Sequence, residues 1–99
     1  MRIRFGSDEL ERMDTDPAYA GRWPAEIVAA FQKTMAFLRI AASERDLRAF
    51  KGLKFEAMKK SPGKFSVRIN QQHRLILSIE SQPGPNNNVL VIEDITDYH

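Results

Sequence analysis

The sequence contains no cysteine among its 99 residues. This absence excludes disulfide bonds, zinc sites with cysteine ligands and a thiol nucleophile, and it is compatible with a reducing compartment. No stretch approaches the roughly 20 apolar residues that a membrane-spanning helix requires. The first five residues include two arginines and lack the apolar run of a signal peptide. The sequence therefore predicts a cytoplasmic protein that does not bind membranes.

The common catalytic motifs are also missing. The chain has no glycine-rich phosphate loop, no nucleophile elbow and no paired histidine motif for a metal ion. Its two histidines are His73 and His99. Metal-dependent hydrolysis is therefore disfavoured, although Asp and Glu side chains can still gather around a magnesium ion. We expect neither a metal nor a cofactor.

Charge is distributed unevenly along the chain. The segment from Arg39 to Arg74 holds ten basic and three acidic residues, a net charge of +7, whereas the rest holds five basic and ten acidic residues, a net charge of −5. A basic segment of this kind indicates a polyanionic partner, of which nucleic acid is the commonest. A solvated basic surface without a ligand is the alternative that charge alone leaves open. The length predicts one domain, covering residues 1–99.

Hydrophobic periodicity divides the chain into a helical first half and a strand-rich second half. It predicts a strand over residues 2–5, a helix capped by Ser7 and ending near residue 13, and a long helix from Pro24 to about residue 42. Residues 43–52 are interpreted as a polar connector anchored by Leu47 and Phe50. Further strands are expected near residues 55–58 and over 65–69, 74–80 and 89–96, with a loop at 82–88. This order predicts an α+β fold, a mostly antiparallel sheet with two N-terminal helices packed on it.

Polar side chains gather around the expected C-terminal strands. Arg68 and Asn70 alternate with apolar residues along one strand, and Arg74 follows across the turn. Two lysines precede that strand, and the chain closes with Asp97-Tyr98-His99. These residues are the candidates for chemistry.

Their chemical types suit RNA cleavage without a metal ion. Such cleavage needs groups that move protons and cations that stabilise the charge of the transition state at phosphorus. Histidine carries protons near neutral pH, arginine binds phosphate, and tyrosine can stack on an unpaired base. Composition alone leaves a solvated charged surface as the alternative.

Several segments of the chain resemble the HigB family of the RelE/ParE toxin superfamily. Residues 63–70 (Gly-Lys-Phe-Ser-Val-Arg-Ile-Asn) and the following Arg74-Leu75 are similar to the family's Gly-x-aromatic-Ser-Ile-Arg-Val-Asn and its aromatic-Arg-Ile/Leu. The last three residues match the family's closing Asp-Tyr-His. The likeness covers nearly the whole chain in the same order and includes Arg22-Trp23, Asp46-Leu47-Arg48 and Phe55-Glu56-Ala57-Met58.

This resemblance implies a compact RelE-like fold and a toxin that cleaves ribosome-bound mRNA. The catalytic residues it implies are Arg68, Arg74, Asp97, Tyr98, His99 and Glu56. The RNA-binding residues expected beside them are Lys54, Lys59, Lys60, Lys64 and Asn70. The expected partners are a HigA-like helix-turn-helix antitoxin, the 70S ribosome and its mRNA, and operator DNA only through the antitoxin.

Three positions depart from the family pattern. Glu56 stands where some relatives carry histidine, which removes a proton donor that works near neutral pH. The run from Met58 to Pro62 is one residue shorter before Gly63. His73 occupies a position where Trp or Tyr is common, and we interpret it as a packing residue on the apolar face. Two alternatives stay open: a gyrase-inhibiting ParE-like toxin, and a catalytically weak relative that only binds its antitoxin or RNA.

Overall fold

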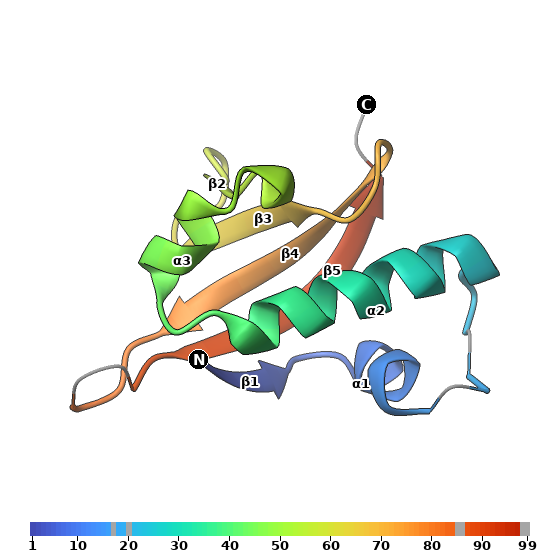
Figure 1. Ribbon diagram of the computed structural model, residues 1–99, viewed down its shortest axis with the longest axis horizontal. Coiled ribbons are helices and arrows are strands. Elements are labelled where there is room, and N and C mark those ends of the chain that lie inside the picture. The colour runs from blue at the N-terminus through green and yellow to red at the C-terminus, as the bar shows by residue number, and fades with distance from the viewer. Residues whose placement is uncertain (17, 20, 85–86, 98–99) are drawn as a thin grey trace.

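The chain folds as a mixed β-sheet with helices packed against it, as the computed structural model in Figure 1 shows. The structure describes residues 1–16, 18–19, 21–84 and 87–97. In this described part, the elements are β1 (Arg2–Phe5), α1 (Asp8–Thr15), α2 (Ala25–Ile40), α3 (Glu44–Ala49), a 3₁₀ turn (Lys51–Leu53), β2 (Glu56–Ala57), β3 (Lys64–Arg68), β4 (His73–Glu80) and β5 (Val89–Asp97). The strand order is β1-β5-β4-β3-β2; β1 runs parallel to β5, and the other neighbours are antiparallel. The predicted α+β class is confirmed.

The first two helices form where local sequence signals place them. The hydroxyl of Ser7 accepts a hydrogen bond from the backbone N–H of Leu10 at 3.3 Å, which caps α1. Acidic residues in the first turn of α1 also stabilise the helix, because their negative charges lie near the positive end of the helix dipole. Pro24 immediately precedes α2, whose buried face includes Phe31 and Met35. Both predicted helices are confirmed.

The segment expected to be a polar connector contains a third helix. The Asp46 carboxylate in the first turn of α3 accepts a hydrogen bond at 2.8 Å from the backbone N–H of Ala42, which precedes the helix. Glu44 and Arg48 form an ion pair one turn apart, also at 2.8 Å. Leu47 is buried and anchors the segment as expected, whereas Phe50 packs its ring on that of Phe37 and stays 41% exposed.

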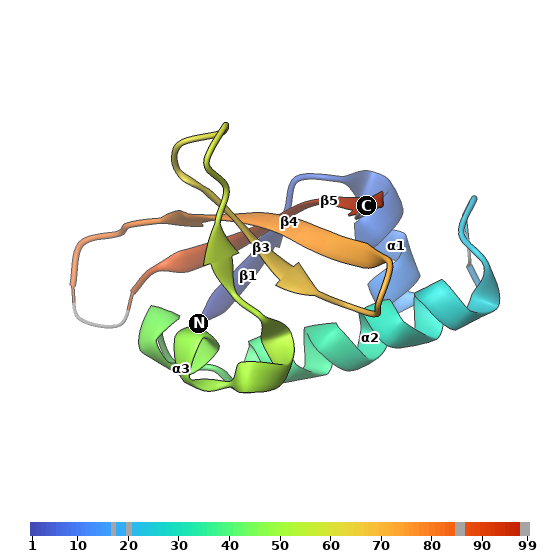
Figure 2. The ribbon, with the colours of Figure 1, turned by 90° about the horizontal axis from the view of Figure 1, so that it is seen from above.

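The hydrophobic core lies between the sheet and the helices. Figure 2 shows α2 and α3 on one side of the sheet, with the loop between β2 and β3 extending from the other side. Val67 of β3 and Leu75 and Leu77 of β4 are fully buried and belong to the core. Because side chains alternate along a strand, Arg68 and Arg74 lie on the opposite face. None of the helices among the described residues is long and apolar enough to cross a membrane.

Candidate functional site

The antiparallel pairing of β3 and β4 sets two arginines side by side. Arg68 lies directly opposite Arg74 in the register. Like charges at facing positions destabilise a sheet unless other groups compensate them. The partners of each side chain therefore determine what the pair can do.

Arg74 is buried and tied into the fold. Its Nε donates to the hydroxyl of Ser66 at 2.9 Å, and its Nη2 donates to the backbone carbonyl of Lys54. The same Nη2 lies 3.6 Å from the Glu56 carboxylate. Only 8% of the residue is exposed. These contacts fasten the 3₁₀ turn and β2 to the centre of the sheet, so the group predicted to bind phosphate also has a structural role.

Arg68 keeps most of its donors available. Its Nε donates to the backbone carbonyl of Asn70 at 3.1 Å, and this is its one hydrogen bond to the described residues. No carboxylate in that part of the chain forms an ion pair with it. The remaining guanidinium N–H groups can therefore bind an anion.

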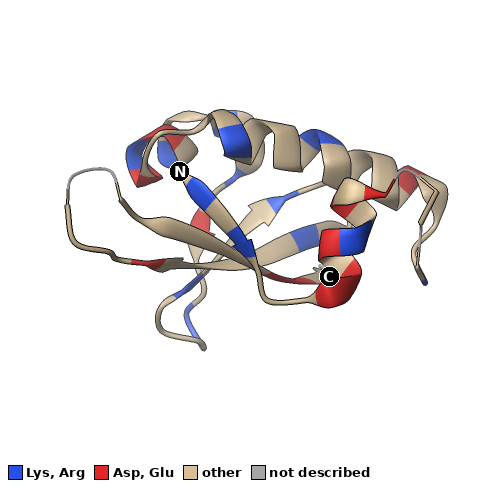
Figure 3. Cartoon of the chain, turned by 90° about the horizontal axis from the view of Figure 1, so that it is seen from below, with Lys and Arg blue, Asp and Glu red and all other residues tan. Residues whose placement is uncertain are grey.

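Two neighbouring hollows open around these arginines. The first, of about 340 Å³, is lined by Lys54, Glu56, Arg68, Asn70, Gln71 and Arg74. The second, of about 550 Å³, shares Glu56 and Arg74 and adds Lys59, Lys60 and Thr96 among its lining residues. Figure 3 shows basic residues on the loop that extends from the sheet between β2 and β3. The structure thus brings together seven of the predicted site residues: Lys54, Glu56, Lys59, Lys60, Arg68, Asn70 and Arg74.

Asn70 also organises the turn between β3 and β4. Its side-chain oxygen accepts hydrogen bonds from the backbone N–H groups of Gln72 and His73, at 2.9 and 2.8 Å. An asparagine that binds the backbone two residues ahead stabilises a turn. Its predicted role in RNA binding stays a prediction, and its observed role is to fix the hairpin that carries Arg68 and Arg74.

Lys64 forms an ion pair with Glu93 in this structure. Glu93 is the extra residue of a β-bulge in β5, because Asp94 pairs with Ile76 while Ile92 pairs with Leu77. Burial raises the pKa of Glu93, but hydrogen bonds from Lys64 and Ser78 and the charges of Lys64 and Arg4 outweigh it, so the pKa is lowered overall. Lys64 does not line either hollow, and RNA would have to compete with this carboxylate for it.

Asp97 lies on the other face from the two arginines. It pairs with His73 in the register, and its carboxylate is 2.7 Å from His73 Nε2. The other ring nitrogen, Nδ1, is 3.1 Å from the side-chain oxygen of Asn70. The ring also meets the edge of Trp23, with a centroid distance of 5.7 Å. His73 packs as interpreted, but the structure does not bring the Asp97 carboxylate together with Arg68 and Arg74; Tyr98 and His99 lie outside the described residues.

Sequence reasoning did not identify Ser66 and Thr96 as parts of the site. Ser66 is the hydroxyl partner of Arg74, and Thr96 faces Arg74 across the β4–β5 pair. Alternation along the strands is the signal that finds both, since each lies on the same face as the arginines. The described residues contain no group of three or more His, Asp or Glu side chains that could hold a metal ion.

Comparison with known proteins identifies a fold relative. No family model matches the chain, and no curated protein matches it. Among solved structures, the chain is similar to the YoeB/ParE toxin from Agrobacterium tumefaciens, with a TM-score of 0.57 and 14% sequence identity. The match covers 100% of both chains. At this identity the likeness concerns the fold, and the chain has the fold of a YoeB/ParE-type toxin.

Proposed function

We propose that the chain is the HigB-type toxin of a type II toxin–antitoxin system and that it cleaves mRNA on the ribosome. The observation that carries this proposal is the pair of facing arginines in a polar hollow of a toxin-like fold. Facing cations are unfavourable alone and favourable around an anion. An RNA phosphate, with Lys59 and Lys60 contacting the adjoining backbone, supplies that anion.

The proposed cleavage uses the 2′-hydroxyl of the RNA as nucleophile. Its oxygen attacks the adjacent phosphorus, the bond to the 5′-oxygen breaks, and the products are a 2′,3′-cyclic phosphate and a 5′-hydroxyl. Glu56 accepts the proton of the 2′-hydroxyl, and Arg68 stabilises the charge that develops on phosphorus. Arg74 holds Glu56 beside the phosphate. No metal or cofactor takes part.

The last three residues complete this mechanism. Asp97, through its contact with His73, fixes the end of β5 from which Tyr98 and His99 follow. In the proposal, His99 protonates the departing 5′-oxygen and Tyr98 stacks on an unpaired base. In this proposal Asp97 is a positioning residue, and Tyr98 and His99 contact the substrate.

The proposal includes the cellular partners of such a toxin. A HigA-like antitoxin with a helix-turn-helix domain holds it inactive and carries the only contact with operator DNA. The 70S ribosome presents the mRNA, and the basic segment of the toxin faces ribosomal RNA. Both the ribosome and the message place the activity in the cytoplasm.

Removal of the Arg68 guanidinium tests the proposal. Purified protein is added to a translating extract, and new 5′ ends of the message are mapped. Arg68→Ala is expected to lower the cleavage rate roughly 100-fold, the order that loss of one transition-state donor brings. The matched control is Arg45→Ala, because Arg45 is exposed on α3 and lines neither hollow. Intact message with the unchanged protein contradicts the proposal and favours a relative that only binds.

A second candidate is gyrase inhibition, because the similar toxin's name includes ParE. A related branch of the superfamily acts on DNA gyrase with the same fold. Induction of the protein in cells separates the two functions. New cuts within translated codons support mRNA cleavage, whereas DNA breaks with intact messages support gyrase poisoning.

A further inference from the structure

A third hollow adjoins the polar site at the edge of the sheet. It has a volume of about 400 Å³ and lies between α2, the 3₁₀ turn and the end of β3. Phe37, Phe50 and Leu53 supply apolar wall, and Lys33 and Arg68 supply charge. Arg68 also lines the polar hollow, so one guanidinium lies at the border of both.

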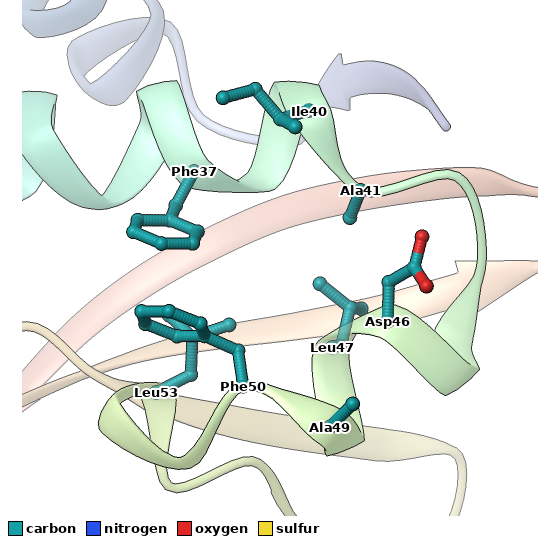
Figure 4. A pocket seen from close by; sticks show the side chains of 8 residues that line it. All are labelled: Phe37, Ile40, Ala41, Asp46, Leu47, Ala49, Phe50 and Leu53. Carbon is teal, nitrogen blue, oxygen red and sulfur yellow. The ribbon is translucent and has the colours of Figure 1, made fainter.

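The aromatic wall of this hollow is held rigidly. The ring centroids of Phe37 and Phe50 are 3.8 Å apart, and Figure 4 shows the two rings facing each other from α2 and from the end of α3. A side chain added at Gly52 would place its Cβ 3.0 Å from the Phe50 ring, so the ring lies directly over this glycine. Phe50 is nevertheless 41% exposed. An exposed aromatic ring that is fixed on two sides offers contact area without loss of side-chain freedom.

The charges at the rim are positive and available. Lys33 and Arg68 form no ion pair with any of the described acidic residues. Lys33 is exposed on α2, and Arg68 is half-buried at the end of β3. The hollow therefore combines an aromatic wall with two cations, which matches a nucleotide: a planar base with a phosphate on each side.

We infer that this hollow is a nucleobase subsite. It receives the unpaired base of the nucleotide whose phosphate Arg68 contacts; Phe50 and Phe37 cover the base, and Lys33 contacts the next phosphate. The inference rests on the proposed function, since it assigns part of the same RNA. It makes Phe50 and Lys33 residues that select and orient the nucleotide beside the cleaved bond.

An apolar segment of a partner protein is the competing occupant. A neighbouring hollow shares Phe37, Phe50 and Leu53 and continues to Ile40, which is 81% exposed. Lys33 and Arg68 line the third hollow and not this neighbouring one, and Arg68 also lines the polar hollow. These two cations favour RNA in the third hollow. Ile40 is consequently the residue whose substitution separates the two occupants.

The test measures binding of a fluorescein-labelled single-stranded RNA and of copies with one abasic nucleotide at each position. For the unchanged protein, one abasic position is expected to weaken binding about tenfold, the order of one base–aromatic stack. Phe50→Leu should weaken binding of the intact RNA about as much and should remove the penalty for the abasic position. Phe50→Tyr should keep the affinity for the intact RNA and the penalty for the abasic position. Lys33→Gln should weaken the binding of the intact RNA and of every abasic copy to the same extent.

Matched controls and contrary outcomes are defined by the same assay. Ile40→Ala and Arg45→Gln are expected to leave RNA binding unchanged. The inference is overturned if the intact protein shows no abasic penalty, or if Phe50→Leu keeps it. Loss of antitoxin binding in Ile40→Ala and Phe50→Leu, with RNA binding intact, overturns it in favour of a protein partner. The binding assay contains no ribosome, so it tests the subsite separately from the proposed cleavage. This pattern of RNA binding, together with intact message in the translating extract, supports the subsite and contradicts the proposed enzyme.

Discussion

The two arginines of the β3–β4 hairpin differ in how far the fold satisfies them. Arg74 is buried and binds Ser66 and the Lys54 carbonyl, whereas Arg68 has a single hydrogen bond to the described residues. One cation therefore shapes the site, and the other is free to bind a ligand. The sequence identifies both because they flank a turn on the polar face of two strands. It does not distinguish them, because the partners that satisfy Arg74 lie 8 and 20 positions away along the chain.

This difference predicts unequal losses of stability when the two arginines are replaced. Arg74→Met leaves the Lys54 carbonyl and the Ser66 hydroxyl without their donor, and buried groups that lose a partner cost about 1–3 kcal/mol each. We expect the free energy of unfolding to fall by about 2–4 kcal/mol. Arg68→Ala should lower it by less than about 1 kcal/mol, because the half-buried Arg68 has a single hydrogen bond to the described residues. Urea unfolding of the two variants measures both, and equal losses would contradict the separate roles.

The Lys64–Glu93 ion pair predicts a dependence of stability on pH. Since the pKa of Glu93 is lowered in the folded chain, its contribution is complete above the unfolded value of about 4.5 and is lost as the pH falls through the folded value. Lys64 is 42% exposed, so we expect at most about 1 kcal/mol. Urea unfolding at pH 7 and pH 3 should show that Glu93→Gln destabilises the protein at pH 7 only.

A double-mutant cycle provides the control for this pair. Glu93→Gln should lower the stability at pH 7 less in the Lys64→Met background than in the unchanged protein, because the ion pair is already absent there. The difference in the free energy of unfolding between the unchanged protein and Glu93→Gln should shrink as the pH falls. If this difference grows instead, another group controls the pH dependence.

At the scale of elements, the sequence predicts what local patterns encode. The alternation of Phe65 and Val67 with polar residues predicts β3, and Ser7 and Pro24 predict the beginnings of two helices; all three are confirmed. The helix over Glu44–Ala49 was missed because six residues are too few to show a helical period. Five of its six residues are Glu, Arg, Leu or Ala, all strong helix formers, and this composition is the signal that could have found it.

Long-range features of the elements could not be predicted. The parallel pairing of β1 with β5 depends on packing across nearly the whole chain. The bulge at Glu93 shifts the register within β5. Because this strand is buried along much of its length, its sequence shows no clear alternation of polar and apolar residues in which such a shift could be recognised. The expected cluster of Asp97 with the arginines failed for a related reason, because the register pairs Asp97 with His73 and Thr96 with Arg74.

At the scale of the whole molecule, the fold gathers charge that is dispersed along the sequence. Lys54, Arg68 and Arg74 come from three segments and line one hollow, and Lys59 and Lys60 line the adjoining one. The excess of basic over acidic residues between positions 39 and 74 predicts that this gathered charge is positive. The position of the hollow depends on the hairpin and on the bonds of Arg74, which composition does not reveal.

This gathering predicts how salt affects RNA binding. Each lysine that neutralises a phosphate contributes about −0.7 to the slope of log affinity against log salt for a single strand. The double variant Lys59→Gln/Lys60→Gln should therefore make the slope less steep by about 1.4 if both lysines contact phosphate. Fluorescence anisotropy of a short single-stranded RNA at several salt concentrations measures the slope. Arg2→Gln/Arg45→Gln removes the same charge from exposed positions outside both hollows. If that control reduces the slope equally, net charge attracts the RNA and the hollows are not the binding site.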